Sequence, residues 1–139
     1  MIADAAAHPC QFMSTTEPLA CTPANAARRA WFRNDLRTFV PAMPMLMCGG
    51  HDDPEVWFQN TVLTDAYFAS HGVAANRVTV LDVDSPAGAG DPYALAKSTF
   101  ADIRDAIAAT GAPTLPYYHG DMLSAACQVA ARDFFATLR

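Results

Sequence analysis

Two short apolar segments, each followed by a turn and then by an amphipathic stretch, constrain the fold of this chain most strongly. The first is PMLMCGG, residues 44–50, and the second is RVTVLDVD, residues 77–84. Short apolar runs closed by turn residues are typical of buried strands. Strands that alternate with helices predict an α/β fold, in which a parallel sheet is covered by helices. Two strands make a very small sheet that can hardly bury both of its faces, so the chain is expected to form part of a larger protein or assembly.

Amphipathic helices are predicted after each strand and at the C-terminal end. In the first, residues 53–72, Asp53 would be the N-cap and Pro54 the first helical residue, with Gly72 just past the end. Asp91-Pro92 begins the second in the same way, and Gly111 ends it. The apolar face of the second would include Leu95, Phe100, Ile103 and Ile107, and that of the last helix Leu123, Cys127, Ala130 and Phe134. Residues 24–36 read as a further short helix and residues 114–120, TLPYYHG, as a brief extended piece.

Composition limits the class of protein. The chain has 139 residues, enough for one domain, and its 52% hydrophobic and 17% charged residues are typical of a globular protein. A net charge of −5 and a single lysine, Lys97, argue against a nucleic-acid-binding surface. No apolar run reaches the roughly 18 residues of a membrane span, and the first ten residues do not form a signal peptide pattern.

The four cysteines give no metal-binding pattern. None forms a C-x-x-C pair, so a structural zinc site is not expected. Cys10 and Cys21 flank a loop rich in proline, threonine and serine, and they would be joined in an oxidising compartment. Cys48 and Cys127 are predicted to be small buried hydrophobic residues.

Two ionisable residues fall where an α/β sheet places its sites. Asp53 follows the first strand and His119 follows the predicted extended piece. Acid before base is the order of the last two members of a Ser…Asp…His triad in α/β-hydrolases. In such a triad the carboxylate holds the imidazole tautomer, and the imidazole removes the serine proton. The structural alternatives are that Asp53 only caps a helix and that His119 only packs beside Tyr117 and Tyr118.

The chain resembles bacterial α/β-hydrolase esterases and secretory lipases from about Arg33 to its C-terminus. The segment PAMPMLMCGGHDDPEVWFQNT is similar to their acid segment, VTVLDVDSP to the following strand, and YYHG…C…ARDFF to their histidine loop and terminal helix. The resemblance implies that Asp53 is the acid, with Asp52 as its neighbour, and that His119 is the general base. It further implies a carboxylic-ester hydrolase without a cofactor, acting on small-molecule or lipid esters, in a family that is often secreted or periplasmic.

The chain departs from that family at the nucleophile. The family's G-x-S-x-G elbow is absent, because none of Ser14, Ser70, Ser85, Ser98 and Ser124 has glycine on both sides at two residues. The family's oxyanion-hole loop has no counterpart either. The resemblance therefore implies the C-terminal portion of an ester hydrolase, inactive alone. Residues 1–30 would be a loop-rich segment like a cap or lid, and residues 31–139 the C-terminal part of the α/β-hydrolase domain.

Three other interpretations stay open. His51, Asp52, Asp53, Asp82, Asp84 and the HGD of residues 119–121 supply ligands suitable for a metal ion. A non-catalytic α/β domain would instead assemble with a partner chain or with itself through an exposed sheet edge. A cysteine hydrolase using Cys48 would resist serine reagents and lose activity to thiol reagents.

Overall fold

A computed structural model describes residues 39–138 together with Ala26, Ala30 and Arg33. The predicted cap-like segment 1–30 and the predicted helix 24–36 lie outside the described residues, apart from those three. Ser14, Cys10 and Cys21 lie outside them as well.

The sheet consists of two parallel strands in the part of the chain that the structure describes. Strand β1 spans Met45–Gly49 and strand β2 spans Val78–Asp82. Met45 pairs with Val78 at one end of the ladder, and Gly49 pairs with Asp82 at the other. Both predicted strands are confirmed, and the fold is mixed α/β.

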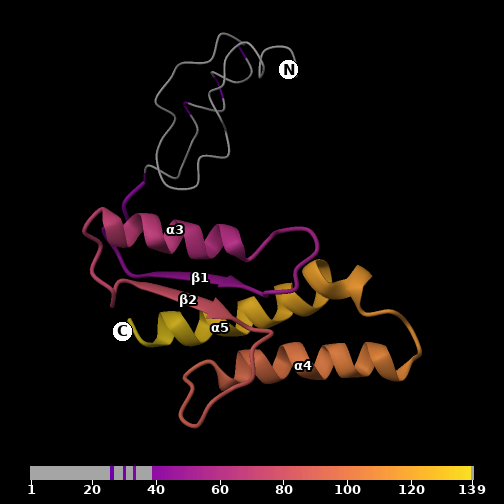
Figure 1. Ribbon diagram of the computed structural model, residues 1–139. Helices are drawn as coiled ribbons and strands as arrows, with labels where there is room; N and C mark the ends of the chain where they lie inside the picture. Colours follow the sequence, from indigo (N-terminus) through magenta and orange to yellow (C-terminus); the bar gives the residue numbers. More distant parts are fainter. Residues whose placement is uncertain (1–25, 27–29, 31–32, 34–38, 139) are drawn as a thin grey trace.

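The helices lie on both sides of this sheet (Figure 1). Helix α3, Gln59–Ser70, connects the strands and contacts both of them. Helices α4, Ala94–Ala109, and α5, Ser124–Ala136, pack against each other on the opposite side, where α5 contacts β1. This arrangement brings the segments that follow β1 and β2 to one edge of the sheet.

The core lies between the sheet and the α4–α5 side. Phe100 of α4 is 1% exposed, and it packs edge-to-face on Tyr118 with ring centroids 5.1 Å apart. The buried cluster consists of Leu81, Val83, Ala96, Phe100, Tyr118, Met122, Leu123, Ala126 and Ala130. The predicted burial of Phe100, Leu123, Ala130 and Phe134 is confirmed, but Leu95 is 52% exposed. Ala96 faces the core in its place because it lies four residues before Phe100, on the same face of α4, and Ile103 and Ile107 on that face are partly buried against the core.

Two predicted elements are wrong in detail. Helix α3 begins at Gln59, not at Pro54, because residues 51–58 form turns before the helix starts. Residues 114–120 are not extended. They lie in a 3₁₀ turn, η2 (Leu115–Tyr117), and a π-helical turn, η3 (Tyr118–Leu123), which continues into α5. A helical turn places Tyr118, Met122 and Leu123 together against the core, which an extended segment would not do.

A disulfide joins Cys48 of β1 to Cys127 of α5, 79 positions later in the chain. The prediction that both cysteines are simply buried hydrophobic residues is therefore wrong. Their Cα atoms lie 5.8 Å apart, within the range for a disulfide. The bond ties the strand that leads to Asp53 to the helix that follows His119.

None of the helices in the described part of the chain is both long enough and apolar enough to span a bilayer.

Candidate functional site

The structure brings Asp53 and His119 together. Asp53 follows β1 through the Gly49-Gly50 pair, and His119 lies in η3 at the same edge of the sheet. Nδ1 of His119 lies 2.7 Å from Oδ2 of Asp53. The pairing across 66 positions was expected from the sequence, although His119 reaches it from a helical turn and not from the end of a strand.

The two carboxylate oxygens of Asp53 have separate partners. Oδ1 accepts the backbone N–H groups of Glu55, at 2.9 Å, and Val56, at 3.1 Å. These are the bonds that an N-cap aspartate makes, but here they hold a turn, since α3 starts later at Gln59. Oδ2 is left for His119. The capping and pairing interpretations of Asp53 therefore apply to different oxygens of one carboxylate.

The electrostatic environment favours the charged forms of this pair. The Asp53 side chain is 1% exposed. Burial raises the pKa of its carboxyl, but hydrogen bonds from His119, Val56 and Glu55 outweigh burial and leave the pKa below its ordinary value. The pKa of His119 is raised, mainly by its hydrogen bond to Asp53 and partly by the charges of Asp53 and Glu55, while desolvation opposes the shift. The carboxylate of Asp53 is thus ionised, and its negative charge stabilises the protonated form of the His119 ring.

The other ring nitrogen of His119 is available for chemistry. With Nδ1–H donating to Asp53, the lone pair of Nε2 is the free proton acceptor. No group in the described part of the chain is hydrogen-bonded to Nε2, and the His119 side chain is 38% exposed. This geometry is that of a general base whose tautomer is fixed by a buried acid.

None of the four serines in the described part of the chain completes a triad. Their hydroxyls donate to backbone carbonyls instead: Ser70 to Tyr67, Ser85 to Asp82, Ser98 to Leu95, and Ser124 to His119. Ser70 ends α3, whose 12 residues place it about 18 Å along the helix axis from the edge that carries Asp53. Cys48 is held in its disulfide, so the interpretation that its thiol is a nucleophile is wrong for this structure.

A second group of charged side chains lies beside the pair, and we call it the His51 cluster: His51, Asp52, Asp82 and Asp84. His51 Nδ1 lies 2.8 Å from Oδ2 of Asp82, while its Nε2 lies 3.7 Å from Asp52 and 3.9 Å from Asp84. The hydrogen bond to Asp82 raises the pKa of His51 most, desolvation lowers it, and the charges of Asp84 and Asp52 raise it further. Of the residues that the sequence predicts as metal ligands, these four therefore lie together, while Asp53 and His119 form a separate pair.

Tyr118 connects the His51 cluster to the Asp53–His119 pair. Its hydroxyl donates to Oδ2 of Asp84 at 2.8 Å and accepts the N–H of Asp52 at 3.3 Å. Burial, and next the hydrogen bond to Asp84, raise the pKa of Tyr118. Its neighbour in the chain is His119, so this buried tyrosine fixes the start of η3 against the loop that follows β1. This role of Tyr118 is not visible in the local sequence, because its partners Asp52 and Asp84 lie 66 and 34 positions away in the chain.

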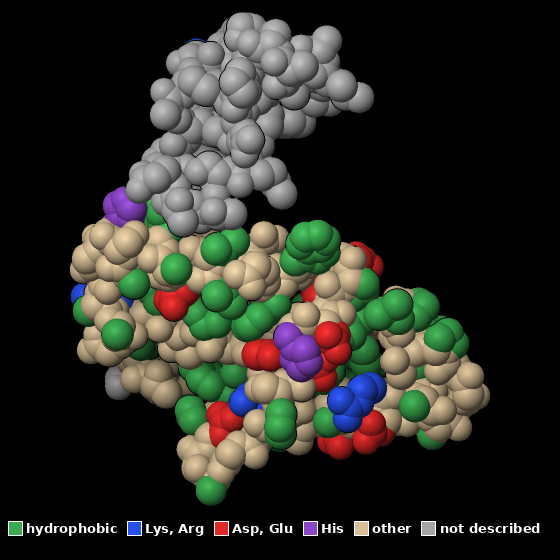
Figure 2. All heavy atoms as spheres, in the orientation of Figure 1, with side chains coloured by type: hydrophobic (Ala, Val, Ile, Leu, Met, Phe, Trp, Pro, Cys, Tyr) green, Lys and Arg blue, Asp and Glu red, His purple; other side chains and the backbone are tan. Residues whose placement is uncertain are grey.

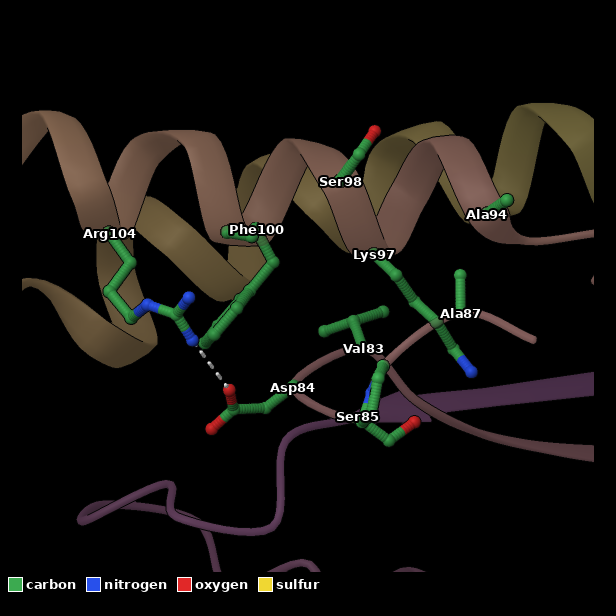
Figure 3. A pocket seen from close by; sticks show the side chains of 11 residues that line it. Val83, Asp84, Ser85, Ala87, Ala94, Lys97, Ser98, Phe100 and Arg104 are labelled. Atoms are coloured by element: carbon green, nitrogen blue, oxygen red, sulfur yellow. Dashed lines mark ion pairs between the residues drawn. The ribbon is translucent and has the colours of Figure 1, made fainter.

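A cavity of about 460 Å³ lies between α4 and the loop after β2 (Figure 3). Asp84 and Ser85 line one side, and Lys97 and Arg104 come from α4. The two cations have partners, since Lys97 lies 2.7 Å from Asp91 and Arg104 lies 3.5 Å from Asp84. The cavity therefore offers no uncompensated positive charge for an anionic ligand.

No known protein family, no curated protein and no solved structure matches this chain.

Proposed function

We propose that this chain supplies the acid, Asp53, and the general base, His119, of a carboxylic-ester hydrolase with an α/β-hydrolase fold. The nucleophilic serine would lie on polypeptide outside these 139 residues. The observation that carries the proposal is the 2.7 Å contact between Nδ1 of His119 and the buried Oδ2 of Asp53, at the carboxyl edge of a parallel sheet. The resemblance of the acid segment and the histidine loop to esterases and secretory lipases supports the same conclusion.

In this proposal each residue has one task. His119 accepts the serine proton at Nε2 as the hydroxyl attacks the ester carbonyl, and returns it to the leaving alcohol. It then activates the water that hydrolyses the acyl-enzyme. Asp53 holds the ring through Nδ1 and stabilises the imidazolium in both steps. Tyr118 does not touch the reacting atoms, and its part is to position η3, and with it His119.

The first test uses a fluorophosphonate probe, which reacts with activated serines. We expect no adduct in the intact mass of the isolated, folded chain, because the four described serine hydroxyls bond to backbone carbonyls. A stoichiometric adduct that maps to a serine of this chain would refute the placement of the nucleophile elsewhere.

The second test examines whether the Nε2 lone pair of His119 is free, with p-nitrophenyl acetate, an ester reactive enough for nucleophilic attack by an imidazole. The wild-type chain should hydrolyse it faster than His119→Gln, with Asp53→Asn between the two or equal to the latter. His71→Gln is the matched control, since His71 stacks on Tyr67 at the far end of α3 and has no carboxylate partner among the described residues. Equal rates for wild type and His119→Gln would contradict the assignment of His119 as the base.

A non-catalytic α/β domain that assembles with a partner is the second candidate. A cavity of about 580 Å³ with mostly apolar residues lies beside β1 and α5, between Pro44, Leu46, Phe134 and Phe135. β1 pairs with no strand but β2 in the part of the chain that the structure describes, and a strand edge without a partner beside such a hollow favours association. Phe135→Asp would weaken self-association in analytical ultracentrifugation under this second candidate. The ester-hydrolase proposal instead requires the dependence on His119 described above.

A further inference from the structure

We propose that the His51 cluster binds a divalent transition-metal ion such as Zn²⁺, through Nε2 of His51 and one carboxylate oxygen each from Asp52 and Asp84. This site is separate from the ester-hydrolase proposal, since neither Asp53 nor His119 is a ligand. Acidic side chains gather on the face of the molecule drawn in Figure 2, and the ion-pair distances identify His51, Asp52, Asp82 and Asp84 as the members of this cluster.

The backbone that carries the ligands is held by the sheet. Gly49 pairs with Asp82 in the last register of the ladder, and Val83 N–H donates to the carbonyl of Gly49 at 2.9 Å. His51 and Asp52 lie in the turn that follows β1 and Gly50, and Asp84 lies in the turn that follows β2 and Val83. Two segments that are distant in sequence therefore bring their side chains together, and the pairing of β1 with β2 holds the backbone that carries them.

Asp82 orients the histidine for metal binding. Its Oδ2 lies 2.8 Å from Nδ1 of His51, and its Oδ1 accepts the backbone N–H groups of His51, at 3.2 Å, and Asp84, at 3.1 Å. With Nδ1–H committed to Asp82, the lone pair of Nε2 faces Asp52 and Asp84. A carboxylate behind a ligating histidine is the usual outer partner in metal sites, where it fixes the tautomer and raises the basicity of the ring.

The spacing of the three ligand atoms is close to what a metal requires. Ligands that lie 2.0–2.1 Å from a tetrahedral Zn²⁺ are about 3.3 Å apart. Here Nε2 lies 3.7 Å from Oδ2 of Asp52 and 3.9 Å from Oδ2 of Asp84, and the three atoms all lie within 4.8 Å of one another. Closing the set takes a movement of about half an ångström between Nε2 and each carboxylate, and of up to about 1.5 Å between the two carboxylate oxygens. Asp52, whose side chain is 76% exposed, can make it, while Tyr118 holds Asp84 in place.

The charge balance also favours a divalent cation. Three carboxylates converge on the one imidazole of His51, and besides that ring the cation that reaches them in the described part of the chain is Arg104, 3.5 Å from Oδ1 of Asp84. Arg104 is shared with Asp105, 3.1 Å away, so it compensates only part of this charge. One imidazole and two carboxylates suit Zn²⁺ or Mn²⁺ better than Ca²⁺, which takes oxygen ligands alone. Three protein ligands leave a position for water.

The test is titration of the untagged chain with Zn²⁺ alone by isothermal calorimetry. We expect one ion per chain in the wild type and in His119→Gln, no binding in His51→Gln, and at least tenfold weaker binding in Asp52→Asn. Asp102→Asn is the matched control for removal of an exposed carboxylate, because Asp102 forms no ion pair with the described residues, and it should bind as the wild type does. Because Asp52 is exposed, its asparagine variant should fold even if His51→Gln does not.

Three outcomes would overturn the proposal. These are absence of binding by the wild type at millimolar Zn²⁺, undiminished binding in Asp52→Asn or His51→Gln, and loss of binding in His119→Gln. The last would place the ion on the Asp53–His119 pair instead. Failure of the ester-hydrolase proposal would be seen in the p-nitrophenyl acetate rates and would leave this result unchanged.

Discussion

Removal of the Cys48–Cys127 disulfide should destabilise this protein strongly. The bond closes a loop across 79 positions that contains α3, β2, α4 and the π-helical turn η3. A cross-link lowers the conformational entropy of the unfolded chain by about 2.1 + 1.5R ln n cal/mol/K, which for this loop is about 15 cal/mol/K, or about 4.5 kcal/mol at 25 °C. That is a large part of the stability of an ordinary small domain, which is about 5–15 kcal/mol.

The assay is urea denaturation followed by circular dichroism, comparing the wild type with Cys48→Ala/Cys127→Ala. We expect the free energy of unfolding to fall by about 4–5 kcal/mol, or the double variant to be unfolded at 37 °C. Cys10→Ala/Cys21→Ala is the control, since it also removes two cysteines and leaves the 79-position loop closed. Reducing conditions should cause the same fall in the free energy of unfolding in the Cys10→Ala/Cys21→Ala variant, where Cys48 and Cys127 are the cysteines that remain.

A loss below about 1 kcal/mol in the double variant would refute the entropic reasoning. It would mean either that the two cysteines are not joined in solution or that the unfolded chain is already compact. Mass shifts after thiol alkylation, with and without reductant, separate these two cases.

Two further predictions concern the candidate site. The hydrogen bond to Asp53 raises the pKa of His119, so this contact stabilises the protein fully below the unfolded pKa of about 6.5 and its contribution is lost as pH rises through the folded value. The stability advantage of wild type over His119→Gln should therefore fall as the pH rises above about 6.5, and an advantage that stays constant would contradict the pairing. Gly50→Ala would place a Cβ 2.3 Å from the Tyr118 hydroxyl, and it should cost about 1–3 kcal/mol of unfolding free energy in urea denaturation. Gly88→Ala is the control, because a Cβ there meets no atom within 4 Å. Tyr118→Phe should recover part of the stability that Gly50→Ala loses. Equal stability of the two alanine variants would disprove the close approach of Gly50 to Tyr118.

The regular elements followed from local patterns. Both strands were predicted because an apolar run closed by Gly49-Gly50 or by aspartates is visible within a few residues of sequence. The ends of α3 and α4 shortly before Gly72 and Gly111 were also predicted, and both glycines have positive φ, at 80° and 79°. The predictions that failed had been made from local patterns, at positions where contacts with residues distant in the chain decide the conformation. Residues 114–120 became helical turns because that conformation buries Tyr118 and Met122 together.

The sequence by itself determined that the chain alternates strands and helices, that an acid precedes a histidine at the sheet edge, and that a G-x-S-x-G elbow is absent. Only the tertiary structure decided how side chains pair across the chain. It places Oδ2 of Asp53 on His119, joins Cys48 to Cys127, and gathers His51 with carboxylates from both strands. The reason is physical: strand and helix patterns depend on neighbours a few residues apart, whereas these pairs depend on strand register and helix packing over tens of residues.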